Sequence, residues 1–508
     1  MGDLGNGGSD EESSGGATEE GTTGGQWTET EAEGFLITED DERISKWAKE
    51  SDLYLWGFWG YPWSDLRIKV SGIDVENSAI KGKNPSYYPV KAGDYYFIYN
   101  ALCELDMPGE WYIDRENGIL YFYPPRENGR VTFGVNTGNI ITIESASNIY
   151  FDGLEISSTG GNGFEIKDSE NIKIYNSEIY DVGALGISLK GRNCNIEKCH
   201  IYNTGSGGVS LSGGDSESLT AGNNIVKNSI IRNYSGNKLA YSSGVLLSGV
   251  GNKVSHNSIY DSPHLAIRLM GNDNVIEYND IFDVLRDVDD SGAIYAYTSK
   301  INRGNEITNN YIHDLKSSIN NTRHGICAIY LDDMFDGVTM TSNVFADIDG
   351  YGVFINGGRD SKVTDNIGVN ITRGLVRMTG IGTNPGYGYE VNDVFLSKSG
   401  LKSGLHKTEA YAKYPNLKNI LEDEPLLSKY NVVKNNVGFN LTNDVVFTDV
   451  AGVDLTEFNE IEDSYIYSVD PGFYDLNSGN YSLRENSKVY EDLPDFVAPE
   501  FDSVGIEN

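Results

Sequence analysis

The sequence predicts an all-β protein, a right-handed parallel β-helix in which short strands coil into a stack. Three observations support this fold class. A strand–turn–strand unit recurs between about residues 131 and 375, Asn recurs at one turn position of the unit, and no segment has the 3.6-residue period of a helical repeat.

The recurring unit is visible when segments such as GISLKGRNCNIEKCHIYNT, GVLLSGVGNKVSHNSIYDS and AIRLMGNDNVIEYNDIFDV are aligned. Each begins with a short apolar strand, continues through a Gly/Asn/Asp turn and ends in an N-x-I-x-x-N-x-I segment. Loops enter at 214–222, 234–242 and 313–326. Stacking such units would form parallel sheets with strands about 4.8 Å apart.

One turn position predicts a ladder of buried amides that hydrogen-bond along the stack. Its expected members are Asn176, Asn228, Asn257, Asn279, Asn310, Asn343 and Asn366. Cys199 takes this position in its own unit, so we expect it to be a core thiol.

The chain divides into four predicted segments. Residues 1–42 form an acidic Gly/Ser/Glu-rich tract that is expected to be disordered. Residues 43–130 form an aromatic-rich β region with a hairpin at Asn117-Gly118. The β-helix coils occupy 131–375, and 376–508 are predicted to hold a loop-rich final coil and a C-terminal cap.

Charge and composition restrict the partners. The net charge of −36 disfavours nucleic acid and anionic membranes, and no apolar run is long enough to cross a bilayer. The N-terminus, MGDLGNGGSDEESSGG, has no signal peptide pattern. The four cysteines lack metal-site spacing, so we expect free thiols, no metal and no cofactor. We also expect a monomer.

Alternation in the first strand of each unit predicts which side chains face outward. One outward column contains Arg268, Tyr295, Tyr330 and Phe354, and the next contains Met270, Tyr297, Asp332 and Asn356. Exposed rings beside polar groups are typical of sugar-binding surfaces. An alternative is an aromatic stack that only stabilises the sheet.

Carboxylates are concentrated near these columns. Asp287, Asp289 and Asp290 precede the strand GAIYAY, whereas Asp332 and Asp333 end the next strand, AIYLDD. A carboxylate pair suits glycoside hydrolysis, in which one group donates a proton and the other attacks or activates water. Carboxylates also suit Ca²⁺ binding.

The expected catalytic pair, Asp290 and Asp332, raises a geometric problem. If both segments were extended, the two residues would lie about 20 Å apart, at about 3.3 Å per residue. They can share a site only if the chain at 287–291 folds back over the sheet. Arg359, Asp360, His264 and His324 lie nearby in the predicted coils and are further candidates for substrate contacts. The alternatives are that the two histidines pack within their loops and that Arg359 pairs with Asp360.

Four segments carry a resemblance to known proteins: PGEWYIDRENGILYFYPP, DDSGAIY followed by RGNEITNNYIHD, AIYLDD, and GVFINGGRD. They resemble the right-handed β-helix glycosidases, specifically glycoside hydrolase family 141, over residues 34–508. The resemblance implies α-L-fucosidase or xylanase-type activity, an extracellular or cell-surface location, and an aspartate pair at Asp290 and Asp332. Relatives open with extra N-terminal coils, where this chain has its acidic tract.

Three functional hypotheses follow. The first is a glycoside hydrolase acting on a plant or microbial polysaccharide. The second is a polysaccharide lyase that uses Ca²⁺ held by the Asp cluster and a base such as Arg268. The third is a non-catalytic carbohydrate-binding or surface protein. Because lyase substrates are polyuronates, the negative charge favours the first hypothesis over the second.

Overall fold

The computed structural model describes residues 35–36, 41–126, 129, 131–319, 325–448, 450, 452–462 and 464–507. The tract predicted over residues 1–42 lies almost entirely outside these ranges. The chain divides into two compact units, 1–133 and 134–508, which are described separately below.

The first unit contains a five-stranded sheet in the order β1-β4-β3-β2-β5. Its strands are β1 (Phe35–Leu36), β2 (Tyr54–Phe58), β3 (Asp65–Asp74), β4 (Ala79–Gly82) and β5 (Tyr96–Tyr99), and Ile44 and Trp47 of helix α1 (Asp41–Trp47) share its apolar core. The predicted hairpin is present as β6 (Trp111–Asp114) and β7 (Ile119–Phe122). The Asn117 N–H donates to Asp114 Oδ1 at 3.0 Å and closes its turn.

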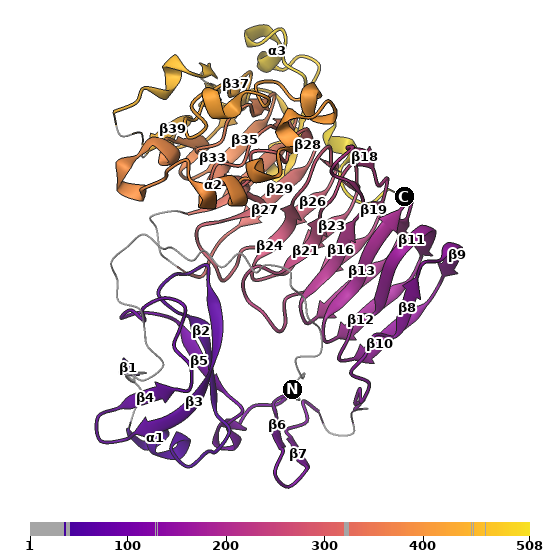
Figure 1. Cartoon of the computed structure of the whole chain (residues 1–508), viewed down its shortest axis with the longest axis vertical. Helices are drawn as coiled ribbons and strands as arrows, with labels where there is room; N and C mark the ends of the chain where they lie inside the picture. Colours follow the sequence, from indigo (N-terminus) through magenta and orange to yellow (C-terminus); the bar gives the residue numbers. More distant parts are fainter. Residues whose placement is uncertain are drawn as a thin grey trace. The chain divides into compact units, whose positions relative to one another are not determined.

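The second unit is a parallel β-helix with three sheets (Figure 1). The first sheet contains β8 (Ile141–Glu144), β11 (Phe164–Tyr175), β13 (Leu185–Arg192), β16 (Gly207–Ser212), β21 (Ser243–Leu247), β24 (Leu265–Leu269), β27 (Ser291–Tyr297), β30 (Ile326–Asp332), β33 (Gly350–Asn356), β36 (Gly374–Thr379) and β39 (Val445–Thr448). All its neighbouring pairs are parallel.

The second sheet contains β9 (Ser147–Asp152), the end of β11, β14 (Asn195–Glu197), β19 (Ile225–Lys227), β22 (Lys253–Ser255), β25 (Val275–Glu277), β28 (Asn305–Thr308), β31 (Val338–Thr341), β34 (Lys362–Thr364), β37 (Val432–Lys434) and β40 (Glu460–Ile461). The third contains β10 (Glu155–Thr159), β12 (Glu178–Val182), β15 (His200–Thr204), β20 (Ile230–Arg232), β23 (Ser258–Tyr260), β26 (Asp280–Phe282), β29 (Tyr311–Leu315), β32 (Val344–Ile348), β35 (Ile367–Ile371), β38 (Val437–Phe439) and β41 (Tyr465–Tyr467). The predicted strand–turn–strand repeat is therefore confirmed.

The interior of the β-helix is filled by the inward-facing apolar side chains. The predicted core columns, which include Ile267, Ile294, Ile329 and Val353, are at most 1% exposed. At about 25 cal/mol per Å² of apolar surface removed from water, these columns are the main source of stability.

The amide ladder is present but begins later than predicted. Asn257, Asn279, Asn310, Asn343, Asn366 and Asn436 bond to one another in sequence through side-chain amides. Asn176 and Asn228 are not members, because each adopts a positive φ in the turn and the following Ser177 or Ser229 faces inward. Cys199 does occupy a ladder position, where its N–H donates to Ser229 Oγ.

A second ladder, which the sequence analysis missed, lies at the turn between the first and second sheets. Asn224, Asn252, Asn274 and Asn305 bond to one another in order along the stack. Each of these residues is the first Asn of an N-x-I-x-x-N-x-I segment, and the second Asn position of that segment supplies the other ladder. Buried amides therefore hold both turns of the segment.

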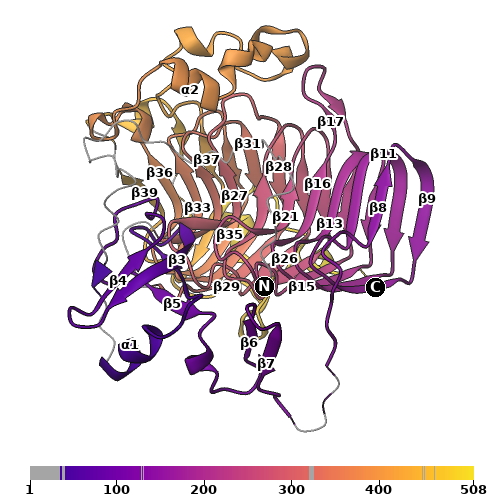
Figure 2. The same cartoon turned by 60° about the horizontal axis from the view of Figure 1, so that its bottom comes forward.

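Residues 380–430 form an insertion between β36 and β37, visible beside β36 and β31 in Figure 2. It contains helix α2 (Asp393–Lys398) and a core that includes Phe395, Tyr411, Leu417 and Ile420. The Tyr411 hydroxyl donates to the Ser216 carbonyl at 2.8 Å, so the insertion reaches back several coils. It therefore lines the same edge of the first sheet for much of its length.

After β41, the C-terminal segment adds the hairpin of β42 (Phe473–Asp475) and β43 (Asn480–Leu483) and the short helix α3 (Lys488–Asp492). Phe473 and Tyr481 pack on Val344 and Val369 of the third sheet. The chain then runs back along that sheet, and the Glu507 N–H donates to Asn228 Oδ1 at 3.1 Å. The segment therefore covers the outer face of the third sheet as well as following the last coil.

Candidate active site

The two outward columns of the first sheet have the predicted register. Arg268 is paired with Tyr295, Tyr295 with Tyr330, and Tyr330 with Phe354. In the second column Tyr297 is paired with Asp332, and the Asn356 amide donates to Asp332 Oδ1 at 2.8 Å. The repeat therefore brings together side chains from four successive coils.

The aromatic column does not form the exposed sugar-binding platform that we expected. Tyr295, Tyr330 and Phe354 are only 6%, 2% and 2% exposed. The Arg377 guanidinium lies 4.2 Å from the centre of the Phe354 ring, and the Tyr330 and Phe354 rings stack at 4.4 Å. The rings instead support polar groups, because the hydroxyls of Tyr295 and Tyr330 each bond to a carboxylate.

The segment before β27 does fold toward the sheet. A Cβ on Gly292 would lie 2.6 Å from the Cβ and 2.9 Å from the backbone nitrogen of Tyr330, so a glycine is required for this close approach. Asp290 adopts a left-handed conformation with φ of 54°. Its Oδ1 accepts a 3.0 Å hydrogen bond from the Tyr330 hydroxyl. Asp290 thus lies beside the outward columns even though it precedes the strand in sequence.

Asp332 is held by three donors. The Tyr295 hydroxyl donates to its Oδ2 at 2.8 Å, and the Asn356 amide and the Asp333 N–H each donate to its Oδ1 at 2.8 Å. The Thr379 hydroxyl donates to Asn356 Oδ1 at 2.6 Å and so fixes the orientation of the amide. These donors hold the Asp332 carboxylate in place.

The carboxyl group of Asp290 has a raised pKa. Burial raises the pKa of Asp290 to about 8, and the nearby charge of Asp332 raises it as well. The hydrogen bond from Tyr330 and the charge of Arg377 act in the opposite direction. Asp290 is therefore protonated at neutral pH, beside a carboxylate that three donors stabilise. A proton donor next to an anion is the arrangement that acid catalysis at a glycosidic bond requires.

Asp289 and Asp333 lie next to the pair. Burial raises the pKa of Asp289, which is 3% exposed and accepts the Asp290 N–H at 2.9 Å. Asp333 accepts a 2.8 Å hydrogen bond from the Tyr389 hydroxyl. Asp333 is partly exposed, so it is placed to contact a ligand, whereas Asp289 supports the backbone of its neighbour.

His264, Arg359 and Asp360 take the packing and ion-pair alternatives and not the substrate-contact one. His264 is buried between the Tyr241 N–H and the Ser291 hydroxyl, and burial lowers the pKa of its imidazole to about 3. It therefore orients the start of β27 as a neutral side chain. Arg359 and Asp360 are buried as well, because they join an ion-pair network beneath the insertion. His324 lies outside the described residues.

This buried network fixes the insertion. Asp336 lies between Lys300 at 2.9 Å and Arg303 at 2.8 Å, and Arg303 also contacts Asp360 at 2.6 Å. Arg359 pairs with Asp423 of the insertion. The network thereby anchors the insertion to the coils, and the insertion in turn brings Tyr389 to Asp333.

Sequence reasoning missed Tyr389 and Arg377. Arg377 of β36 is paired with Phe354 of β33. Extending the outward column by one coil, into the segment GLVRMT, would therefore have identified it. No comparable signal existed for Tyr389, because the 380–430 insertion lies outside the repeat and its path is set by long-range contacts.

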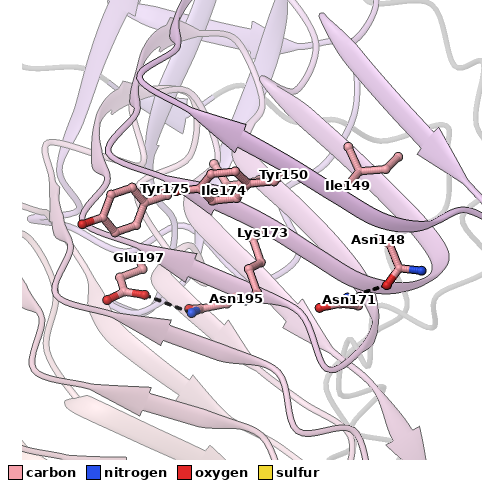
Figure 3. A pocket seen from close by; sticks show the side chains of 9 residues that line it. All are labelled: Asn148, Ile149, Tyr150, Asn171, Lys173, Ile174, Tyr175, Asn195 and Glu197. Carbon is pink, nitrogen blue, oxygen red and sulfur yellow. Dashed lines mark hydrogen bonds between the residues drawn. The ribbon is translucent and has the colours of Figure 1, made fainter.

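A hollow of about 450 Å³ lies elsewhere, on the outer face of the second sheet (Figure 3). It is lined by Tyr150, Lys173, Tyr175 and Glu197, among others, and Glu197 accepts a 3.0 Å hydrogen bond from Asn195. Its lining contains one carboxylate, so it lacks the paired acids of the first sheet.

A Ca²⁺ ion would require several converging ligands. Within the described ranges, no group of three or more His, Cys, Asp or Glu side chains is arranged to hold a metal ion. The oxygens of Asp290 and Asp332 are directed instead at tyrosine hydroxyls and amides. In the described part of the chain, no helix is long and apolar enough to span a membrane.

Comparisons with known proteins agree with the fold. The family model for the right-handed β-helix region matches residues 127–245 and 229–367. No curated protein sequence matches this chain. A solved glycoside hydrolase is 12% identical with a TM-score of 0.45, and the match covers 72% of this chain and 71% of the hydrolase.

Two further solved structures match with lower TM-scores. Pectate lyase Pel9A is 14% identical with a TM-score of 0.33, over 70% of this chain and 80% of the lyase. PfbA, a surface adhesin of Streptococcus pneumoniae, is 10% identical with a TM-score of 0.37, over 61% of this chain and 75% of the adhesin. With identities of 10–14% and TM-scores of 0.33–0.45, these likenesses carry no argument about the present chain. The chain is a right-handed parallel β-helix protein, as predicted.

Proposed function

We propose that the protein is a glycoside hydrolase that cleaves a plant or microbial polysaccharide outside the cell. The arrangement that carries the proposal is Asp290, whose pKa burial raises to about 8, beside the triply hydrogen-bonded Asp332 on the outward side of the first sheet. The resemblance to glycoside hydrolase family 141, with its aspartate pair, supports the same assignment.

In the proposed reaction, Asp290 transfers its proton to the glycosidic oxygen as the bond to the anomeric carbon breaks. Asp332 either attacks the anomeric carbon or removes a proton from the water that does so. In both cases one water molecule is consumed and one new reducing end appears. The Tyr295 hydroxyl and Asn356 amide keep the Asp332 carboxylate aligned for this step.

The test is product analysis of the full chain on a panel of plant and microbial polysaccharides, with and without EDTA. New reducing ends without ultraviolet absorbance from unsaturated sugars, unaffected by EDTA, are expected. Unsaturated ends that disappear with EDTA would establish the lyase alternative, and binding without any new ends would establish a carbohydrate-binding protein.

A matched control separates the site from general effects of the substitution. Asp168 is an exposed aspartate in a left-handed turn, with φ of 47° against 54° for Asp290. Asp168→Asn should retain full turnover, whereas Asp290→Asn and Asp332→Asn should not. Equal activity of all three variants would contradict the proposal.

A further inference from the structure

Arg268 is an unusual cation in this protein. Its Nε is buried and has no hydrogen-bond partner, and among the described residues its guanidinium forms no ion pair. The chain has 75 acidic and only 39 basic residues, so an unpaired arginine stands out in it. Several other cations of the coils have carboxylate partners, such as Lys253 with Glu277 at 2.9 Å and Arg286 with Asp261 at 2.6 Å.

The position of Arg268 places it next to the proposed catalytic pair. Its strand neighbour Tyr295 donates to Asp332. Burial raises the pKa of the Tyr297 hydroxyl, the charge of Asp333 raises it too, and the charge of Arg268 lowers it. Tyr297 therefore lies within the fields of both Arg268 and Asp333. Along the first sheet, Arg268 in β24 lies one coil before β27, which Asp290 directly precedes, and two coils before Asp332 in β30.

The surroundings of Arg268 suit a sugar. Met270, two residues after Arg268, is 41% exposed, and Tyr241, whose ring lies 5.7 Å from that of His264, is 38% exposed. Apolar surface next to a charged donor is the combination that sugar rings with a charged substituent require. Arginine also presents a planar fork that matches a carboxylate bidentately.

The charge of the whole chain limits what this substituent can be. A net charge of −36 repels a polymer in which every sugar is acidic. Beyond about 10 Å that repulsion is screened at ordinary ionic strength, so a single anionic group next to Arg268 is still attracted. Local attraction and long-range repulsion together favour a sparsely charged polymer.

We infer that the substrate is a mainly neutral polysaccharide with isolated carboxylate-bearing sugars, and that Arg268 binds one such carboxylate next to the bond that is cleaved. The inference rests on the proposed hydrolase function. Arg268 is then a specificity-determining residue, two coils upstream of Asp332, and hydrolysis occurs at a defined spacing from each acidic sugar.

The test compares one polysaccharide with acidic side groups before and after chemical reduction of its carboxylates to alcohols. Wild-type kcat/KM should be about 10–100-fold higher on the acidic polymer, as expected for one charge-assisted contact. Arg268→Gln should abolish this preference and Arg268→Lys should restore part of it. Arg286→Gln, which changes a paired arginine on the third-sheet side, should keep the full preference.

A binding measurement keeps the inference testable if Arg268→Gln is poorly folded. In Asp290→Asn, acidic oligosaccharides should bind more tightly than their reduced forms, and rising salt should diminish the difference. Equal wild-type rates on both polymers, or a preference retained by Arg268→Gln, would overturn the inference and leave the hydrolase proposal intact. Absence of hydrolysis on every polymer would instead refute the hydrolase proposal.

Discussion

The Tyr330 hydroxyl donates a 3.0 Å hydrogen bond to Asp290, a residue forty positions earlier in the chain. Tyr330 belongs to a strand of the repeat, whereas Asp290 belongs to the turn that precedes the neighbouring strand. This contact places a buried carboxyl group beside Asp332, and it is a feature that substitution can test directly.

The first prediction concerns the pH dependence of catalysis. Because Asp290 must be protonated to act as the acid, kcat/KM should fall as the pH rises through about 8. The Tyr330 hydrogen bond lowers the pKa of Asp290, so Tyr330→Phe should move this alkaline limb to higher pH. Tyr295→Phe also removes a tyrosine hydroxyl, but that hydroxyl bonds Asp332 and not Asp290. This variant should therefore leave the alkaline limb of the pH–rate profile in place. Measuring kcat/KM against pH for the wild type, Tyr330→Phe and Tyr295→Phe tests this prediction.

The second prediction separates the roles of the two carboxyl groups. Asp290→Asn and Asp332→Asn should each lower kcat on the natural polymer by about 10²–10⁴-fold. Aryl glycosides with a good leaving group need no proton, so Asp290→Asn should recover much of its rate on them. Asp332→Asn should stay inactive, because the attacking or activating group is missing. The same recovery in both variants would show that the roles are assigned incorrectly.

The third prediction concerns stability. The native pKa of Asp290 is about 8, above the ordinary value of 3.8, so the native state binds more protons than the unfolded state between these values. Its contribution to the free energy of unfolding therefore decreases as pH rises from about 4 to about 8. Asp290→Asn removes this penalty and should raise the melting temperature by a few degrees at pH 8 while changing it little at pH 4. Melting curves of the wild type and Asp290→Asn at the two pH values test the direction of this change. A variant that is less stable than the wild type at pH 8 would contradict the prediction.

The fourth prediction concerns the amide ladder. Asn310 donates to the Ile276 and Thr308 carbonyls and to Asn343, and it accepts from Asn279. Asn310→Ala leaves several of these buried groups unpaired and should cost about 3 kcal/mol or more. Asn176→Gly is the control, because Asn176 is exposed and its φ of 48° suits glycine. Denaturant unfolding should show a large loss for the first variant and almost none for the second.

The fifth prediction concerns the buried ion pairs. Asp336 is 0% exposed and neutralises Lys300 and Arg303. Asp336→Asn leaves the buried Lys300 without a carboxylate partner, although Arg303 keeps Asp360, and should cost about 3–5 kcal/mol. Asp393→Asn, at a carboxylate that is 87% exposed, should be neutral. Comparable melting temperatures for the two variants would mean that the network does not stabilise the insertion.

Local patterns accounted for much of the fold. The inward columns of Ile267, Ile294 and Ile329 could be identified from alternation alone, since a strand places every second side chain on one face. The ladder was misplaced by one residue at Asn176 and Asn228, because Asn favours both a left-handed turn and a buried ladder position. Sequence alone does not separate these two uses.

The sequence by itself determined the coil, the register of the outward columns and the identity of Asp332 as their central carboxylate, because each follows from a repeat of short range. Only the tertiary structure decided that Tyr295 and Tyr330 are buried supports, that Asp290 reaches the sheet across Gly292, and that Tyr389 arrives from the insertion. These features depend on the paths of non-repeating segments. Such paths are set by packing and buried ion pairs between residues far apart in the chain, and no local periodicity encodes them.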